Sequence, residues 1–399
     1  MDRLQALGEI IEKPQAGYWG ASERSGASTV AARVVRNGDA ARSQTITTEK
    51  LPLRWFSPKE VARAQLHIDD TVLVSSGEVG FASRVVGLDA DYPSLASNFV
   101  RRVRAADGHN PVWLAHLLQL AETKRIAERF SGGTAIHNLG SDFFGRYRVH
   151  VPPLEEQRRI GEILDTVDEA IQTTERVIAK LDTIAGALAE ACISRVGTED
   201  LVRLGDECRV LGGKRLPAGH AYSHTQTPYR YLRVVDFYRR NVDYDSLAAL
   251  SEATFQALGR YEIRSGELFI SIAGSIGYVG VNQPPPGMRT ILTENAARIV
   301  PSKSLVPSYL ALQMNSSAVR AQVRAEIGTG GGVPKLALHR VANVRVSCPD
   351  TRTQNEVAQW YESARAARDA EARRLEKLRK FRVGLAADLL SGEVRAVPA

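Results

Sequence analysis

Residues 151–195 read VPPLEEQRRIGEILDTVDEAIQTTERVIAKLDTIAGALAEACISR, and this stretch decides the fold. Apolar or small residues return along it at alternating steps of four and three, which is the a/d spacing of a heptad repeat. The stripe consists of Ile160, Leu164, Val167, Ile171, Thr174, Ile178, Leu181, Ala185, Leu188 and Cys192. A helix of about 40 residues is roughly 60 Å long. Because that length exceeds what a globular core needs, the stretch predicts a coiled-coil spacer.

The same plan returns 197 residues further along the chain, since Gln157 follows one Pro-marked turn and Gln354 follows another. Other pairs share this offset: Leu7 with Leu204, Gly77 with Gly274, Gly80 with Gly277, Asn98 with Asn295, Leu139 with Leu336 and Arg148 with Arg345. One offset kept over about 150 residues predicts an internal repeat, in which each half is a mixed segment followed by a long helix.

The second helix carries a more polar stripe than the first. Its equivalent positions are Val357, Tyr361, Ala364, Arg368, Glu371, Leu375, Leu378, Arg382, Leu385 and Leu389. If the two helices pair, Arg368, Glu371 and Arg382 must find partners or water, because an unpaired buried charge is costly. These polar positions either fix register and partner choice or belong to a partly exposed helix. The basic run from Arg365 to Arg382 fits a solvated face better than a phosphate contact.

The mixed segments indicate an α+β fold. Short strand-like runs occur at Thr71–Ser75, Glu267–Ser271 and Arg345–Ser347, with Gly and Pro between the periodic stretches. We expect one helix from Pro111 to Phe130 and its counterpart from Pro307 to Ile327, each with proline in its first turn.

The composition is that of an ordinary globular protein with a basic balance. The 399 residues are 44% hydrophobic and 24% charged, and 52 Lys and Arg against 45 Asp and Glu give a net charge of +7. This balance is compatible with a polyanionic partner but is weak evidence for one. Three separated cysteines, no apolar run of membrane-spanning length and no N-terminal h-region favour a cytoplasmic protein.

Candidate nucleic-acid contacts lie in two kinds of segment. Glycine-rich loops at 131–138 and 328–335 match under the offset and could approach a phosphate closely, although flexible turns would look the same. Each half also begins with mixed basic and aromatic residues, some of which we expect to be core. The candidates for DNA contact are Tyr18, Trp19, Arg24, Arg33, Arg36, Arg54, Gly132, Gly133, Thr134, Asn138, Lys214, Arg215, His220, Arg230, Arg233, Arg239, Arg240, Thr329, Gly330 and Lys335.

Motifs for catalysis are missing from the sequence. It has no Walker loop, no strand–GxGxxG–helix fingerprint and no HExxH. His220 and His224 are four apart, but Pro217 and Pro228 flank them, so we predict a loop and no metal site. No catalytic residue is assigned.

The combination of repeat, turn and helix resembles the specificity subunits of type I restriction-modification systems. The residues that carry the resemblance are the run 151–160 (VPPLEEQRRI), the run 264–271 (RSGELFIS) with Gly274 and Gly277, and the run 387–392 (ADLLSG). The second turn, 348–354 (CPDTRTQ), departs from the pattern because it lacks the Leu and Glu of the first. The two turns that precede the long helices therefore differ, and the resemblance does not imply strictly equivalent surfaces for docking of partner proteins in the two halves.

The resemblance implies two target-recognition domains, at 1–153 and 197–350, and two spacer helices, at 154–196 and 351–392, with a tail at 393–399. The helices would form an antiparallel coiled coil. Each domain would recognise one half of a split, asymmetric site in double-stranded DNA. Helix residues implied in pairing and partner docking are Ile160, Leu164, Val167, Ile171, Ile178, Leu181, Leu188, Val357, Leu375, Leu378, Leu385 and Leu389.

The resemblance also implies protein partners and a non-catalytic role. Two methyltransferase subunits would bring S-adenosylmethionine and, in systems that also cleave, two motor-nuclease subunits would use ATP and Mg²⁺. This chain would itself bind no cofactor. Two other classes stay open: a DNA-modifying enzyme that recognises its own target, and a coiled-coil adaptor without a DNA role.

Overall fold

The computed structural model describes residues 3–41, 43–133, 137–195, 201–237, 242–327 and 334–396. The chain divides into unit 1, Met1–Glu175 with Arg374–Ala399, and unit 2, Arg176–Arg373. Two long helices, α6 (Leu154–Arg195) and α12 (Thr351–Ser391), contribute residues to both units. In the described part of the chain, no helix is both long and apolar enough to cross a bilayer.

Unit 1 contains two larger β-sheets. The first has the order β2 (Gln15–Ala16), β9 (Val100–Val103), β6 (Thr71–Val74), β7 (Ala82–Gly87) and β4 (Thr45–Thr47). The second has the order β5 (Leu53–Phe56), β3 (Val30–Val35) and β8 (Ser94–Ala96), with β3 and β8 parallel. Two further antiparallel pairs are β1 (Arg3–Ala6) with β12 (Arg148–Val151) and β10 (Ser131–Gly132) with β11 (Asn138–Leu139). The central strand β6 is buried along its whole length, which explains its apolar run of Val72, Leu73 and Val74.

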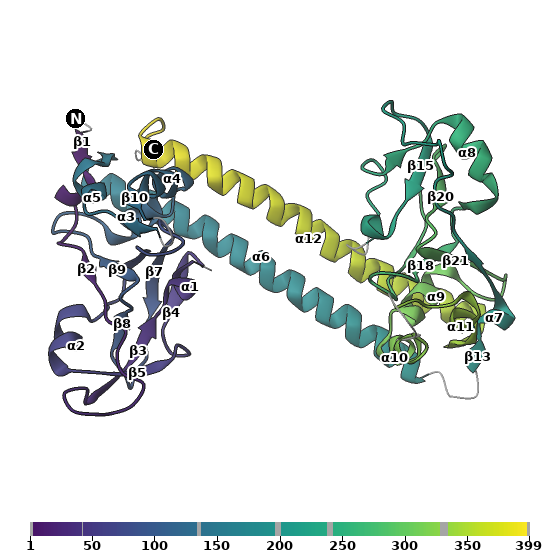
Figure 1. Ribbon diagram of the computed structural model, residues 1–399, viewed down its shortest axis with the longest axis horizontal. Helices are drawn as coiled ribbons and strands as arrows, with labels where there is room; N and C mark the ends of the chain where they lie inside the picture. Colours follow the sequence, from purple (N-terminus) through teal and green to yellow (C-terminus); the bar gives the residue numbers. More distant parts are fainter. Residues whose placement is uncertain are drawn as a thin grey trace. The chain divides into compact units, whose positions relative to one another are not determined.

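Short helices lie at both ends of unit 1. They are η1 (Leu7–Glu9), α1 (Asn37–Ala40), α2 (Pro58–Ala64), α3 (Pro111–Leu118), α4 (Ala121–Arg129) and α5 (Asp142–Arg146). Figure 1 shows α3, α4 and α5 at the end of the unit that holds both chain termini, and α2 beside β3 and β8 at the other end. The prediction of one helix from Pro111 to Phe130 is wrong, because Leu120 has extended backbone (φ −59°, ψ 138°) and separates α3 from α4.

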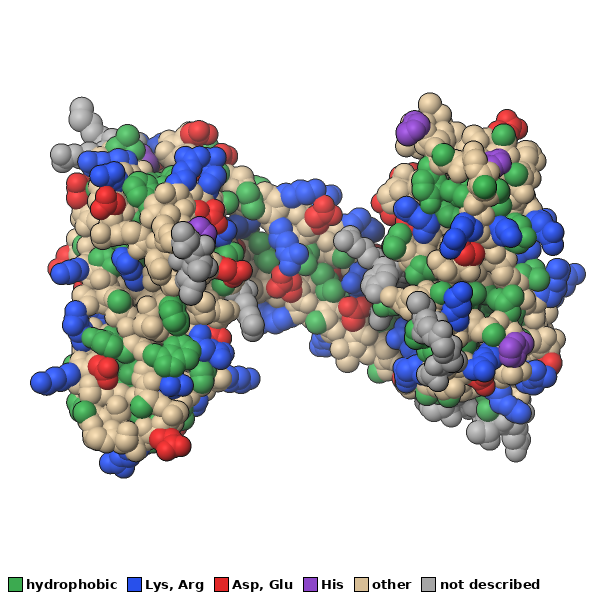
Figure 2. All heavy atoms as spheres, viewed as in Figure 1, with side chains coloured by type: hydrophobic (Ala, Val, Ile, Leu, Met, Phe, Trp, Pro, Cys, Tyr) green, Lys and Arg blue, Asp and Glu red, His purple; other side chains and the backbone are tan. Residues whose placement is uncertain are grey.

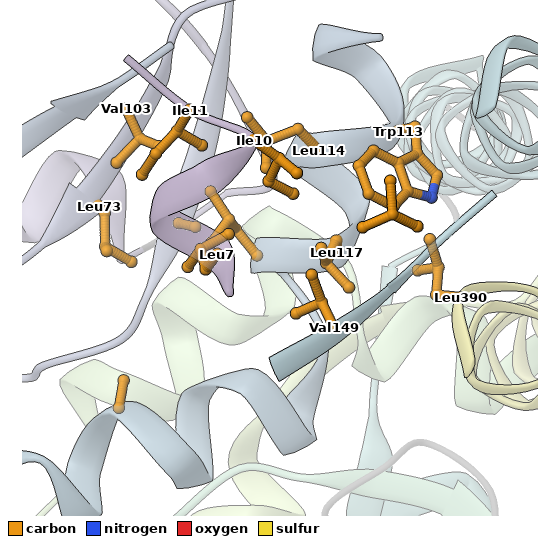
Figure 3. Close-up of a cluster of buried hydrophobic side chains, with 14 of the residues drawn as sticks. Leu7, Ile10, Ile11, Leu73, Val103, Trp113, Leu114, Leu117, Val149 and Leu390 are labelled. Atoms are coloured by element: carbon orange, nitrogen blue, oxygen red, sulfur yellow. The ribbon is translucent and has the colours of Figure 1, made fainter. Parts of the chain in front are cut away.

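The main core of unit 1 joins segments far apart in the sequence. Leu7, Trp113 and Leu117 pack with Leu389 and Leu390 of α12. Figure 3 shows Leu390 reaching toward Trp113 from the C-terminal helix. Burying large apolar side chains is the dominant stabilising contribution in such a core. The last turns of α12 are therefore part of the same core as the N-terminal segment of the chain.

Unit 2 also contains two larger β-sheets, each of four strands. One has the order β14 (Cys208–Gly212), β21 (Ala296–Pro301), β18 (Leu268–Ser271) and β19 (Val279–Val281). The other has the order β16 (Ala248–Ala249), β15 (Tyr229–Leu232), β20 (Arg289–Leu292) and β17 (Glu262–Ile263), with β15 and β20 parallel. A further pair is β13 (Leu201–Arg203) with β22 (Arg345–Ser347).

Its short helices are α7 (Leu204–Glu207), η3 (Val234–Phe237), α8 (Glu252–Leu258), η4 (Gly259–Tyr261), α9 (Pro307–Met314), α10 (Ser317–Ala325) and α11 (Leu338–Asn343). Figure 1 places α8 beside β15 and β20, and α9, α10 and α11 at the other end of this unit. The predicted helix from Pro307 to Ile327 is likewise broken. Ser316 is extended (φ −67°, ψ 158°), and its hydroxyl caps α10 by accepting from the Val319 amide.

The glutamines of the two turns make the same contacts in the two units. The side chain of Gln157 donates to Pro152 O and accepts from the Asn110 amide, each at 2.8 Å. Gln354 donates to Pro349 O and accepts from the Val306 amide, also at 2.8 Å. Both side chains are buried, so each satisfies backbone groups that water does not reach. A glutamine therefore holds the start of each long helix against the preceding turn.

The offset between matching backbone positions changes by one residue within the units. Val35 pairs with Ala96 in β3–β8, whereas Leu232 pairs with Leu292 in β15–β20. The residue numbers of Val35 and Leu232 differ by 197, whereas those of Ala96 and Leu292 differ by 196. The sequence match of Asn98 with Asn295 is therefore wrong by one position, because the turn after β8 corresponds to the turn after β20 with the shorter offset.

Candidate nucleic-acid interface

An exposed aromatic group of unit 1 lies on the loop after β2 and the turn after β8. Trp19 is 44% exposed and Phe99 is 37% exposed, and their rings meet edge to face with centroids 6.1 Å apart. The Arg54 guanidinium carbon lies 5.0 Å from the centroid of the Trp19 ring. We call Trp19, Arg54 and Phe99 the aromatic surface. Large exposed aromatic side chains beside arginine are typical of binding surfaces.

The backbone fixes this surface in place through two glycines. The Gly17 amide donates to Val100 O at 3.3 Å, and a Cβ on Gly17 would lie 1.8 Å from Ala96 O. Gly20 has φ +72°, and a Cβ there would lie 2.5 Å from the ring of Phe56. The loop can follow this path only with glycine at both positions.

Arg54 is held on the indole by its own hydrogen bonds. Its Nε and Nη2 donate to Gly20 O at 3.2 and 2.9 Å. A neighbouring contact places the Arg24 guanidinium 5.8 Å from the Trp55 ring, where Ala21 and Trp55 exchange backbone hydrogen bonds. Arg24 is exposed and lies over Trp55, which follows Arg54 in β5 and therefore points to the opposite face of that strand.

Three other candidates of unit 1 are engaged within the protein. Arg33 pairs with Asp89 at 2.7 Å and donates to Leu51 O, and Arg36 pairs with Asp39 at the start of α1. The pKa of Asp89 lies below its ordinary value because the Asp91 amide and then Arg33 donate to it. Tyr18 packs against the core that includes Val34 and Phe56. These contacts give the three side chains structural roles.

The glycine loop of unit 1 lies beside a second turn. Gly132 and Asn138 pair in the short hairpin of β10 and β11, and Gly133 follows with φ +134°. The Gly77 amide donates to His137 O at 2.9 Å, so the loops meet. Thr134 lies outside the described residues.

Unit 2 carries a charged pair on the loop after β14 and the turn after β20, the counterparts of the loop after β2 and the turn after β8 in unit 1. Arg215 and Glu294 approach to 2.7 Å, and the Arg215 side chain is 78% exposed. We call these two residues the charged pair. Partial burial acts to raise the pKa of Glu294, but hydrogen bonds, foremost from Arg215, outweigh it and hold the pKa below its ordinary value. Lys214 is exposed, and its carbonyl accepts from the Tyr231 hydroxyl at 2.8 Å.

Other candidates of unit 2 are partly internal. Arg230 is only 6% exposed and donates to the Gln226 side chain at 2.7 Å and to Thr227 O. Arg233 pairs with Asp236 at 2.8 Å, and His220 contacts Thr254 at 2.9 Å. Lys335 is exposed and forms a β-bridge with Ala273. The remaining candidates Arg239, Arg240, Thr329 and Gly330 lie outside the described residues.

The predicted helix stripes are buried to different degrees. Ile160, Leu164 and Leu389 are buried in the core of unit 1, with Leu385 packed against it. The half-buried members are Val167, Ile171, Ile178, Leu181, Val357, Leu375 and Leu378. The side chain of Leu188 lies outside the described part.

Two arginines of the second stripe have charged partners, one in a buried setting and one in an exposed setting. Arg382 donates to both carboxylate oxygens of Asp168 at 3.0 and 3.1 Å and to His116 Nδ1 at 3.2 Å. Because Arg382 donates to Nδ1, His116 donates from Nε2 to Asp165 at 2.9 Å. In unit 2, Arg368 lies 3.5 Å from Asp182. The arginines that looked unfavourable in the stripe are thus paired.

Phe99 and Glu294 were not among the candidates from sequence. Phe99 precedes the basic run 101–104, but both Phe99 and Glu294 lie in turns after short strands and not at the start of either half, where the candidates were sought. A correct alignment of the turns at 97–100 and 293–296 would have paired Asn98 with Glu294 and Phe99 with Asn295. The one-residue change of offset hid this alignment.

Comparison with known proteins identifies relatives of the chain. Residues 61–183 match the family model of the type I restriction modification DNA specificity domain. The type I restriction enzyme EcoBI specificity subunit of Escherichia coli is 24% identical over 326 residues, which are 72% of this chain and 67% of that protein.

Solved structures are similar in fold. The S subunit of a type I restriction-modification system from M. genitalium has a TM-score of 0.62 at 12% identity, covering 98% of this chain and 96% of that chain. A chain from a structure described as "Structural basis underlying complex assembly and conformational transition of the type I R-M system" has a TM-score of 0.57 at 15% identity, covering 98% of each chain.

Proposed function

The chain belongs to the family of type I restriction-modification specificity subunits, and we propose that it recognises a split, asymmetric DNA sequence without catalysing a reaction. The observation that carries this proposal is that the two units share the backbone path of a loop but present different side chains on it. The aromatic surface of unit 1 and the charged pair of unit 2 lie in corresponding loops. Two readers with different side chains suit two different half-sites.

We further propose that α6 and α12 form an antiparallel coiled coil that serves as the spacer. Ion pairs between the helices support this arrangement, since the residue numbers of the α12 partners fall as those of the α6 partners rise. The pairs are Asp168 with Arg382, Glu175 with Arg379, and Asp182 with Arg368. A spacer of fixed length would set the gap between the half-sites.

Methyltransferase subunits are the proposed protein partners. Exposed apolar side chains on the long helices support docking there, among them Trp360 and Phe381 on α12 and Ile184 on α6. Two copies would bind, with S-adenosylmethionine on these partners. In a system that also cleaves, ATP and Mg²⁺ would act on motor-nuclease subunits.

The test is to express this chain with the methyltransferase subunit encoded beside it, in a host that lacks adenine methylation. Methylated adenines are then mapped by long-read sequencing. We expect a new split motif that appears only when this chain is present. The matched control is the methyltransferase subunit expressed alone.

Two outcomes would contradict the proposal. Adenine methylation by this chain without its partner would make it an enzyme. The absence of adenine methylation by an intact, soluble complex would favour an adaptor that recognises no DNA sequence.

A further inference from the structure

The loops that follow β2 and β14 share their backbone contacts although their side chains differ. In unit 1 the Tyr18 amide donates to Ala96 O at 3.0 Å, and in unit 2 the Lys214 amide donates to Leu292 O at 2.9 Å. Gly17 has a counterpart in Gly213, where a Cβ would lie 2.1 Å from Thr293 O. The residues that follow, Trp19 and Arg215, therefore occupy corresponding places.

The partners of Trp19 and Arg215 lie in corresponding turns but at neighbouring positions. The Ser75 amide donates to Phe99 O at 2.9 Å, and the Ile272 amide donates to Asn295 O at 2.8 Å. Phe99 therefore matches Asn295, and Asn98 matches Glu294. Where unit 1 presents two aromatic rings, unit 2 presents a carboxylate, an amide and a guanidinium.

The setting of Trp19 limits how it can contact DNA. Full intercalation of an indole between two base pairs would place a base on each of its faces. Arg54 covers one face of the indole and is fixed there by two hydrogen bonds to Gly20 O. The open edge of Trp19 and the exposed ring of Phe99 remain available for apolar contact with base edges.

Apolar groups on base edges are scarce in DNA. In the major groove the thymine 5-methyl group is the apolar feature, and Phe and other apolar side chains contact it. The charged pair offers hydrogen-bond donors and acceptors instead, which suit polar base edges.

We propose that unit 1 reads its half-site through contact of Trp19 and Phe99 with thymine methyl groups, whereas unit 2 reads polar base edges at the corresponding place with Arg215 and Glu294. This inference rests on the proposed function and specifies its chemistry. The half-site of unit 1 then contains at least one thymine whose methyl group contributes to affinity.

The test replaces each thymine of the mapped split site by deoxyuridine, which removes only the methyl group. Binding of the full chain with its methyltransferase partners is measured by fluorescence anisotropy. We expect about fourfold weaker binding at one or more positions of one half-site, the effect of losing a methyl-sized apolar contact. For Trp19→Ala and Phe99→Ala, replacing thymine by deoxyuridine at these positions should no longer weaken binding. Trp19→Phe should keep part of the deoxyuridine effect.

Ile68→Ala is the matched control, because Ile68 is an exposed apolar residue of unit 1 outside the aromatic surface. It should keep the full response to deoxyuridine, and thermal unfolding should show all variants folded. The inference is overturned if no deoxyuridine weakens binding of the wild type. It is also overturned if Trp19→Ala and Phe99→Ala respond as the wild type does. Failure of the proposed function looks different, since the wild type would then bind no split sequence at all.

Discussion

At the scale of single residues, Arg382 links α12 to α6 and α3 within unit 1. It is 7% exposed and pairs with Asp168 and His116. Arg382→Met should destabilise the protein by about 3 kcal/mol, the lower end for a buried pair, because the Asp168 carboxylate, which is 17% exposed, loses its partner. The measurement is the urea midpoint of the transition that involves unit 1.

Arg379→Met is the matched control on the same helix. The Arg379 side chain is 60% exposed and pairs with Glu175 on the surface. Exposed pairs contribute about 0–1 kcal/mol, so this variant should unfold nearly as the wild type does. Equal effects of the two variants would contradict the assignment of Arg382 as a buried link.

Asp165 connects the same group of charges to acid stability. Burial acts to raise its pKa, but hydrogen bonds from His116 and Arg84 outweigh burial and leave the pKa below its ordinary value. A lowered pKa adds stability above the pKa of the unfolded chain, about 3.9, and this stability is lost as pH falls through the folded value. The advantage of wild type over Asp165→Asn should therefore shrink as pH falls below about pH 4. A difference that does not depend on pH in thermal unfolding would contradict this reasoning.

At the scale of elements, the last turns of α12 complete the core of unit 1. Leu390 is buried there, and Arg395 pairs with Glu156 at 2.6 Å just beyond the helix. Leu390→Ala should destabilise the unit by about 2–5 kcal/mol. We expect faster hydrogen exchange in residues 1–153, far away in sequence. The exposed Val383→Ala on the same helix should leave exchange unchanged, and an effect of Leu390→Ala confined to 374–396 would contradict the prediction.

The long helices were predictable because period and length are properties of the sequence itself. Their observed bounds, Leu154–Arg195 and Thr351–Ser391, lie beside the predicted ranges 154–196 and 351–392. The breaks at Leu120 and Ser316 were not, since both residues lie within apolar-periodic runs. Trp19 and Arg54 could be chosen by residue type, but the burial of Arg230 follows from the position of β15 inside its sheet, which the sequence alone does not show. The contact of Trp19 with Phe99 depends on tertiary structure alone.

At the scale of the whole molecule, the net charge of +7 is shared unequally. Residues 176–373, which form unit 2, hold 25 Lys and Arg against 19 Asp and Glu, whereas unit 1 holds 27 against 26. On the face in view, Figure 2 shows basic side chains gathered over unit 2 and mixed charges over unit 1. Phosphate attraction should therefore come mainly from unit 2.

This asymmetry predicts how binding depends on salt. Each phosphate neutralised by a cation adds about 0.9 to the slope of log K against log salt concentration. If Lys214 and Lys335 of unit 2 both contact phosphates, Lys214→Gln with Lys335→Gln should reduce the slope by about 2 and weaken binding to all sequences alike. The matched pair in unit 1, Lys13→Gln with Lys59→Gln, should leave the slope nearly unchanged. Equal losses from the two double variants, measured by anisotropy between about 50 and 200 mM salt, would mean that both units share the phosphate contacts despite their unequal charge.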